Sequence, residues 1–151
     1  MAAFGSAVAR RFGAMRFLIL TVAATLAGAV AHIVAYPGGQ GVMIGASGAV
    51  SGMTAAAARF ALMPGGPLGS GRGQPDAFHM PAPPLQAVFS NRNTLIFVGV
   101  WFAINLLFGV QGTLLPGVEG AIAWQAHIGG FLAGFLIFGF IDPVPGRPPS
   151  R

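Results

Sequence analysis

The chain has 151 residues, of which 54% are hydrophobic and only 7% are charged, against about 25% charged residues in ordinary soluble domains. So few charges cannot cover the surface of a soluble fold, and the composition therefore indicates a membrane protein. The net charge is +5, but the basic residues are spread over separate segments and do not form the face that nucleic-acid binding needs. With no cysteine, disulfides, thiol catalysis and cysteine-bound metals are excluded.

Four long apolar runs follow one another along the chain. Each is close to the ~20 residues that a helix needs to cross a hydrocarbon core of ~30 Å. Backbone polar groups must be satisfied inside a bilayer, so these runs have to be helices. The predicted fold is therefore an all-α polytopic membrane helix bundle with four transmembrane helices. The spans cover about residues 17–36, 42–63, 94–110 and 121–141.

Residues 1–16 form a short basic lead-in to the first run. An alternative is a secretory signal peptide, because Arg10 and Arg11 precede an apolar stretch and small residues at 29–31 resemble a cleavage site. The apolar run continues to Tyr36, however, which is longer than the about 7–15 residues of a signal core. A membrane span is the favoured interpretation.

The distribution of arginine predicts the topology. Arginines occur before the first run, from the end of the second run to the start of the third, and after the fourth, whereas the other two connections carry none. The positive-inside rule then places both termini in the cytoplasm. We expect an integral, multi-pass protein of a bacterial inner membrane. The eight arginines are Arg10, Arg11, Arg16, Arg59, Arg72, Arg92, Arg147 and Arg151.

Two segments are rich in proline and glycine. The longer one, residues 64–92, separates the second and third runs, and its composition predicts a flexible or extended linker on the cytoplasmic side. Residues 143–151 have the same character and are predicted to be a disordered tail.

Glycines occur four residues apart near the start of the second run and within the fourth run. This spacing is typical of membrane helices whose backbones approach closely. Helix packing is therefore the first interpretation of these residues. They are Gly48 and Gly52, preceded by Gly45, in the second run, and Gly130 and Gly134 in the fourth.

The chain has three histidines, and one of them stands out. His127 lies inside the fourth run, where an ionisable side chain is costly and marks a functional site by default. The alternative is a histidine that a neighbouring helix satisfies, and we favour that alternative for His32, which has no companion motif. His79, in the linker, is expected to be solvated.

Topology brings His127 together with a serine. If both termini are cytoplasmic, the second and fourth runs both enter the membrane from outside, so Ser47 and His127 lie within about 10 Å of the same face. A histidine in hydrogen-bond reach is what activates a serine hydroxyl. No acidic third residue is available, because Asp76 and Asp142 are on the cytoplasmic side and Glu119 is in an outer loop. The residues therefore predict a Ser-His dyad in which packing must orient the imidazole.

These residues carry a family resemblance. Gly-x-Ser-Gly, followed two spans later by Ala-His-x-x-Gly-x-x-x-Gly, resembles the signature of rhomboid intramembrane serine proteases. The resemblance covers about residues 4–142, from the third to the sixth helix of the family's six-helix core, so that 17–142 is a partial rhomboid domain. Residues 4–18 resemble the loop before the third helix, and 101–105 fit the fifth. The signature positions are Gly45, Ser47, Gly48, Ala126, His127, Gly130 and Gly134.

The resemblance implies an intramembrane serine endopeptidase that cleaves transmembrane protein substrates. Ser47 would be the nucleophile and His127 the base, and the backbone N–H groups of Ser47 and Ala46, at a helix N-terminus, would bind the oxyanion. Membrane lipid and transmembrane substrates are the expected partners, nucleic acid is not, and neither a cofactor nor a metal is implied.

The sequence also departs from the family. The first two helices and a His-x-x-x-Asn pair are not matched, so the chain reads as a fragment or as a gene model begun at an internal Met. Ser51 stands where some members place a tyrosine under the catalytic histidine. The alternative function is therefore a catalytically inactive rhomboid-like protein that binds membrane helices. A small transporter is a third class, but Asn105 and Gln125 are too few polar residues to line a path.

Overall fold

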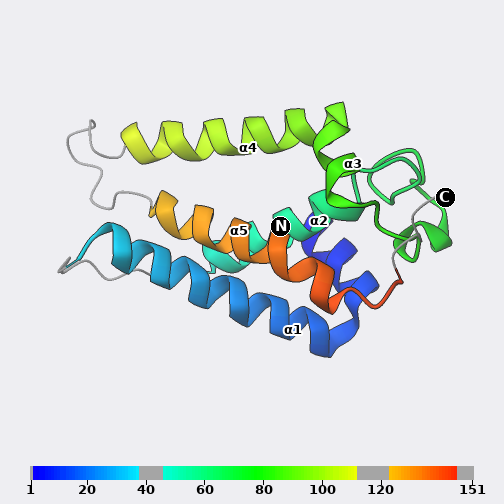
Figure 1. Ribbon diagram of the computed structural model, residues 1–151, viewed down its shortest axis with the longest axis horizontal. Helices are drawn as coiled ribbons and strands as arrows, with labels where there is room; N and C mark the ends of the chain where they lie inside the picture. The colour runs from blue at the N-terminus through cyan, green and yellow to red at the C-terminus, as the bar shows by residue number, and fades with distance from the viewer. Residues whose placement is uncertain (1, 38–45, 112–122, 146–151) are drawn as a thin grey trace.

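The computed structural model describes residues 2–37, 46–111 and 123–145 (Figure 1). Within these ranges the chain is all-α, as its composition predicts, with five α-helices, one 3-10 helix and no strand. The elements are α1 (Ala2–Ala35), α2 (Ser47–Phe60), η1 (Pro75–Phe78), α3 (Leu85–Ser90), α4 (Arg92–Gln111) and α5 (Trp124–Ile141).

Two described helices are long and apolar enough to cross a membrane, namely Phe4–Ala35 within α1, and α5. The apolar stretch of α4, Arg92–Leu107, is shorter. The sequence predicts a span over residues 42–63, but the described helix in this region, α2, has 14 residues. At a rise of about 1.5 Å per residue, this helix is shorter than a hydrocarbon core of ~30 Å. Residues 42–45 of that predicted span lie outside the described part of the chain.

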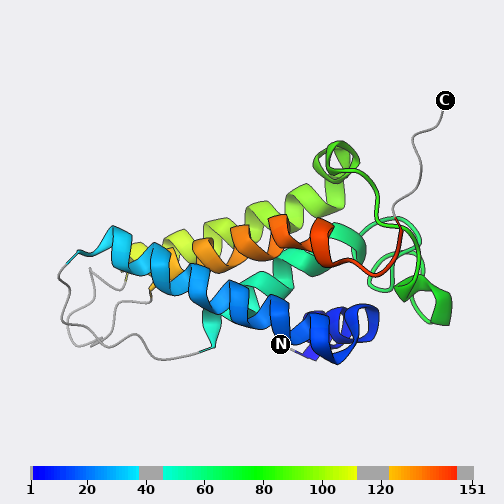
Figure 2. The ribbon, with the colours of Figure 1, turned by 60° about the horizontal axis from the view of Figure 1, so that its bottom comes forward.

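The helices are arranged around α5. In Figure 1, α5 lies between α1 and α4, and α1, α2 and α5 pack closely on one another while α4 contacts α5 more sparsely. The view in Figure 2 agrees: α2 and α5 run in one direction, and α1 and α4 run in the other. The first residues of α2 and of α5 therefore point toward the same end of the bundle.

A glycine divides α1 into two helical parts. Gly13 has φ 70° and ψ 172°, a backbone conformation that is essentially restricted to glycine. Before this kink the chain is helical from Ala2, so the segment interpreted as a basic lead-in is largely a helix, and its side chains Ala7, Val8 and Phe12 are buried. The hydrophobic core that they join consists of Ala7, Val8, Phe12, Leu20, Ala56, Ala57, Phe60, Ala61 and Phe138.

The segment between α2 and α3 is folded, which corrects the flexible linker predicted from its composition. Its turns are closed by backbone hydrogen bonds, among them Leu68 N–H to Ala61 O at 2.9 Å and Gly71 N–H to Gly66 O at 3.1 Å. Ala77 of η1 is buried. Proline and glycine occur here because they suit tight turns, and the turns pack against the end of α2.

Arg11 joins three parts of this end of the molecule. Its Nε and Nη2 donate to the two carboxylate oxygens of Asp142, at 2.8 and 2.7 Å, and its Nη1 donates to the carbonyl oxygens of Phe78 and Met80. The guanidinium also lies 4.6 Å from the centroid of the Phe60 ring. Arg11 is 2% exposed, so it is a structural residue and more than a topogenic charge.

Arg59, near the end of α2, is buried as well. Its Nη1 donates to Phe135 O at 2.8 Å, and its guanidinium lies 5.2 Å from the ring centroid of Phe135 and 4.8 Å from that of Phe138. Among the described residues no carboxylate lies within 4.0 Å of it. The arginine is therefore held by a carbonyl dipole and two aromatic faces.

Candidate active site

Ser47 is the first residue of α2, and its side chain is exposed. Ala46 before it provides no side-chain cap. The first hydrogen bond of the helix runs from Val50 N–H to Ala46 O at 3.0 Å, so the N–H groups of Ser47, Gly48 and Ala49 have no acceptor within the helix. The hydroxyl of Ser47 thus lies at a helix end whose dipole and free N–H groups suit a developing negative charge.

Glycines place α2 in backbone contact with α5. A Cβ added to Gly130 or Gly134 of α5 would collide with the carbonyl oxygen of Gly48 or Gly52 of α2, and one added to Gly52 would lie 3.0 Å from Gly130 O. Backbone atoms cannot turn away as a side chain can, so a larger residue would separate the helices. Gly45, the other glycine of the motif, lies outside the described residues.

The same packing sets Ser47 and His127 on adjoining stretches of backbone. A Cβ on Gly48, the residue after Ser47, would lie 3.5 Å from the carbonyl oxygen of Ala126, the residue before His127. From α1, a Cβ on Gly28 would lie 2.7 Å from the same oxygen. Within the described ranges the two side chains are not hydrogen-bonded to each other. In unliganded enzymes such bonds are often long and tighten only with substrate.

His127 has a hydrogen-bond partner on α4. Its Nδ1 lies 2.5 Å from Oδ1 of Asn105, and Nδ2 of Asn105 donates to Trp101 O at 2.7 Å. The imidazole is half-buried, and its Nε2 bonds to no other described residue. The sequence predicts that packing orients the imidazole, and the structure adds a hydrogen bond between the imidazole and the amide of Asn105 to that packing.

An aromatic layer joins α4 to α5 next to this hydrogen bond. Trp101, one turn before Asn105, stacks on Phe131, one turn after His127, with ring centroids 4.5 Å apart. Phe102 meets the same Phe131 ring edge-on at 5.2 Å. Stacked and edge-to-face rings have preferred geometries, so this layer fixes the register in which Asn105 faces His127.

The acidic residues lie elsewhere. Asp142 follows the last turn of α5 and pairs with Arg11, Asp76 belongs to η1, and Glu119 lies outside the described residues. Within the described part of the chain, no group of three His or acidic residues could hold a metal ion. A carboxylate partner for His127 is therefore not found among the described residues.

Ser51, the residue in place of a tyrosine, is engaged with the backbone of its own helix. It is 4% exposed, and its hydroxyl donates to Ser47 O at 2.8 Å. A hydroxyl held in this way does not point at the imidazole, so Ser51 neither supports His127 nor competes with Ser47.

The other histidines are not part of this arrangement. The His32 ring lies 5.5 Å from the Tyr36 ring, and Tyr36 Oη accepts a hydrogen bond from Gln125 Nε2 at 3.2 Å. Nδ1 of His32 is buried without a partner among the described residues, so the expected hydrogen bond from a neighbouring helix is not found there. His79 is exposed, as predicted.

Three functional or structural residues are not identified by reasoning from the sequence. Arg11 and Arg59 are counted there as topogenic charges, and Asn105 is dismissed as an isolated polar residue. A signal for Asn105 exists, because an amide inside an apolar run needs a partner just as a histidine does. No sequence pattern links Asn105 to His127, since they lie on different helices.

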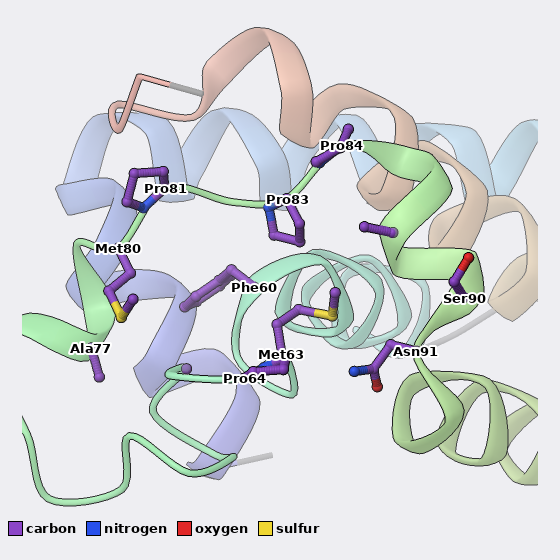
Figure 3. Close-up of a pocket in the computed structure, with 12 residues that line it drawn as sticks. Phe60, Met63, Pro64, Ala77, Met80, Pro81, Pro83, Pro84, Ser90 and Asn91 are labelled. Atoms are coloured by element: carbon purple, nitrogen blue, oxygen red, sulfur yellow. The ribbon is translucent and has the colours of Figure 1, made fainter. Parts of the chain in front are cut away.

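A separate cavity lies at the opposite end of α2 from Ser47. Figure 3 shows its lining, in which Phe60 and Met63 lie below the proline-rich chain that carries Pro81, while Met80 and Asn91 lie on opposite sides. Its volume is about 470 Å³. It contains neither Ser47 nor His127, so it is not part of the candidate active site.

Comparison with protein families matches the Rhomboid domain to residues 1–142 of the 151-residue chain. Searches among the curated proteins and among the solved structures gave no significant match. The family match spans every helix described above, and a rhomboid domain is embedded in the membrane, in keeping with the two membrane-length apolar helices. The resemblance carried by the two sequence motifs is thereby confirmed, and the chain belongs to the rhomboid family.

Proposed function

We propose that the protein is an intramembrane serine endopeptidase in which Ser47 is the nucleophile and His127 the general base. The observation that carries this proposal is the backbone contact between α2 and α5, where the residue after Ser47 meets the residue before His127. Membership of the rhomboid family supports it further. A histidine beside a serine is what activates the hydroxyl, and the helix N-terminus at Ser47 suits the negative charge that develops in the reaction.

The chemistry follows from these groups. Ser47 Oγ attacks a peptide carbonyl while His127 Nε2 takes its proton, and the negative charge that develops on the carbonyl oxygen is stabilised by the N–H groups of Ser47 and Ala46. His127 then gives the proton to the leaving amine, and water, deprotonated by the same imidazole, releases the acyl group. The substrates would be transmembrane proteins whose helix unwinds locally, since a helical peptide carbonyl is already hydrogen-bonded.

The membrane topology is part of the same proposal. Four spans with both termini in the cytoplasm, as in a multi-pass protein of a bacterial inner membrane, would put the starts of α2 and α5 near the outer face. The common direction of these two helices supports this. Reporter fusions at residues 40, 78, 117 and 151 test it. Cytoplasmic signal at 40 or 117, or external signal at 78 or 151, would reject the arrangement.

Fluorophosphonate labelling in isolated membranes tests the nucleophile. The probe should label the wild type, Ser47→Ala should abolish labelling, and His127→Ala should reduce it by about 10²–10⁴-fold, the usual contribution of a positioned base. Ser51→Ala is the matched control. Its hydroxyl bonds only to Ser47 O among the described residues, so this variant should label nearly as the wild type does. Equal labelling of Ser47→Ala and wild type would reject Ser47 as the nucleophile.

One observation favours a second function. Because Ser47 and His127 are not hydrogen-bonded to each other among the described residues, the chain is also suited to holding membrane helices without cleaving them. In that case the wild type would remain unlabelled while still binding transmembrane peptides in the same membranes. This result would replace the protease by a rhomboid-like binding protein.

A further inference from the structure

The hydrogen bonds of Asn105 determine which way its amide faces. A backbone carbonyl can only accept a hydrogen bond, so the group 2.7 Å from Trp101 O must be the amide nitrogen. The opposite orientation would set two oxygens against each other. The amide oxygen is therefore the atom that faces His127 Nδ1, 2.5 Å away.

This orientation in turn fixes the proton on the imidazole. Oδ1 of Asn105 can only accept, so Nδ1 of a neutral His127 must carry the hydrogen, and Nε2 is left with a lone pair. A general base needs this lone pair to take the proton of a serine hydroxyl. The other tautomer would present an N–H group to Ser47 and could not act as its base.

We propose that Asn105 is a positioning residue that holds His127 in the Nδ1–H tautomer, with Nε2 free to accept the proton of Ser47. The catalytic unit is then Ser47, His127 and Asn105, contributed by α2, α5 and α4. The inference rests on the proposed role of His127 as the base, but the tautomer itself can be measured without any activity.

An amide suits this task in a membrane. An aspartate in the same place would bury a full negative charge among apolar helices, which is costly without further partners. Asn105 is uncharged, and its amide is satisfied on both sides, by Trp101 O and by His127. The stacking of Trp101 on Phe131 holds the two helices in register one turn away, so the orientation does not rely on the hydrogen bond alone.

Nitrogen-15 NMR of the protein in lipid nanodiscs, with labelled histidine, reads the tautomer directly, because protonated and unprotonated ring nitrogens have well separated shifts. The His127 signals are assigned from the spectrum of His127→Ala. In the wild type we expect Nδ1 protonated and Nε2 unprotonated. In Asn105→Leu, which removes the acceptor, we expect loss of this single state. Asn93→Leu, at an exposed position of the same helix, is the matched control and should leave the His127 spectrum unchanged.

A second variant keeps the inference testable if Asn105→Leu does not fold. Asn105→Asp keeps an oxygen toward Nδ1 whether the carboxyl is charged or neutral, and the neutral form can also donate to Trp101 O as the amide does. It should therefore retain the Nδ1–H tautomer. Fluorophosphonate labelling should be at least about 10-fold slower in Asn105→Leu, with the 10²–10⁴-fold contribution of a positioned base as the upper limit, and substantially restored in Asn105→Asp.

The outcomes separate this inference from the proposed function. A wild-type His127 protonated on Nε2 would overturn the inference, whatever the labelling shows. So would equal labelling of wild type and Asn105→Leu once the tautomer has changed. If the wild type is never labelled, the proposed protease fails, and the spectra alone then decide whether Asn105 sets the tautomer.

Discussion

Arg11 and Asp142, 131 positions apart in the chain, form a two-pronged ion pair that joins the first part of α1 to the end of α5. Both side chains are almost fully buried, and the same arginine donates to two carbonyl oxygens near η1. Arg11 thus donates to four acceptors, two of them on Asp142, and the pair closes the end of the bundle opposite the candidate active site.

Loss of Arg11 should destabilise the fold strongly. Arg11→Ala leaves the buried Asp142 carboxylate without its ion-pair partner, which typically costs about 3–5 kcal/mol in the free energy of unfolding. Thermal unfolding of the purified protein in detergent, followed by circular dichroism, measures the change. Arg16→Ala removes an exposed arginine of the same helix and should alter stability by less than about 0.5 kcal/mol. Similar losses in both variants would contradict the role of the pair.

Arg59→Lys tests whether the planar guanidinium matters. A lysine keeps the charge but lacks the planar, weakly hydrated group that suits contact with the faces of Phe135 and Phe138, so we expect a loss of about 1–2 kcal/mol in the free energy of unfolding. The control is Arg72→Lys at an exposed position, which should unfold at the wild-type temperature. Wild-type stability of Arg59→Lys would mean that its charge alone is needed.

The glycine contact between α2 and α5 should be intolerant of a methyl group. Gly130→Ala places a Cβ against the backbone of Gly48 and should cost about 1–3 kcal/mol. Because the same contact sets Ser47 beside His127, labelling by the fluorophosphonate should also fall. Gly139→Ala, in the same helix but with no atom within 4 Å of the added Cβ, should keep wild-type labelling. A fully active and stable Gly130→Ala variant would show that the helices are farther apart.

The helices could be predicted from the sequence because long apolar runs in a chain so poor in charge have few alternatives to a membrane bundle. The length of α2 could not, because its apolar run extends past both of its ends, whereas the helix itself is bounded by the turns that follow Phe60. The structure of residues 64–92 is even harder to predict from the sequence. Proline and glycine are typical of flexible linkers and of tight turns alike, and only contacts with distant residues such as Arg11 distinguish the two.

The candidate site also has residues that the sequence identifies and one that it does not. Ser47 and His127 could be identified because their motifs are local and their helices have the same direction. Asn105 could not be linked to His127, since the register of α4 on α5 depends on how Trp101 and Phe102 pack against Phe131. Sequence spacing within one helix carries no information about such a register.

Alanine substitutions at Gly13 and at Gly5 of α1 should change the stability of the protein in opposite directions. Gly13→Ala forces an L residue to φ 70°, a strain of about 1–3 kcal/mol. Gly5 has its nearest contact, Met53 Sδ, at an ordinary 3.6 Å, so Gly5→Ala should stabilise the helix by about 0.5–1 kcal/mol. Melting temperatures of the two variants measure this. A stabilised Gly13→Ala variant would contradict the kink.

The kink at Gly13 also has a consequence for chirality. The mirror image of φ 70°, ψ 172° falls at the edge of the extended region that ordinary L residues occupy, so the backbone here has the conformation of a relaxed D-amino acid. A protein assembled by chemical ligation with D-alanine at position 13 should therefore escape the backbone strain that its L-alanine twin suffers. The two molecules would have identical composition, charge and hydropathy. Any difference in their stability would come from the handedness of a single carbon atom.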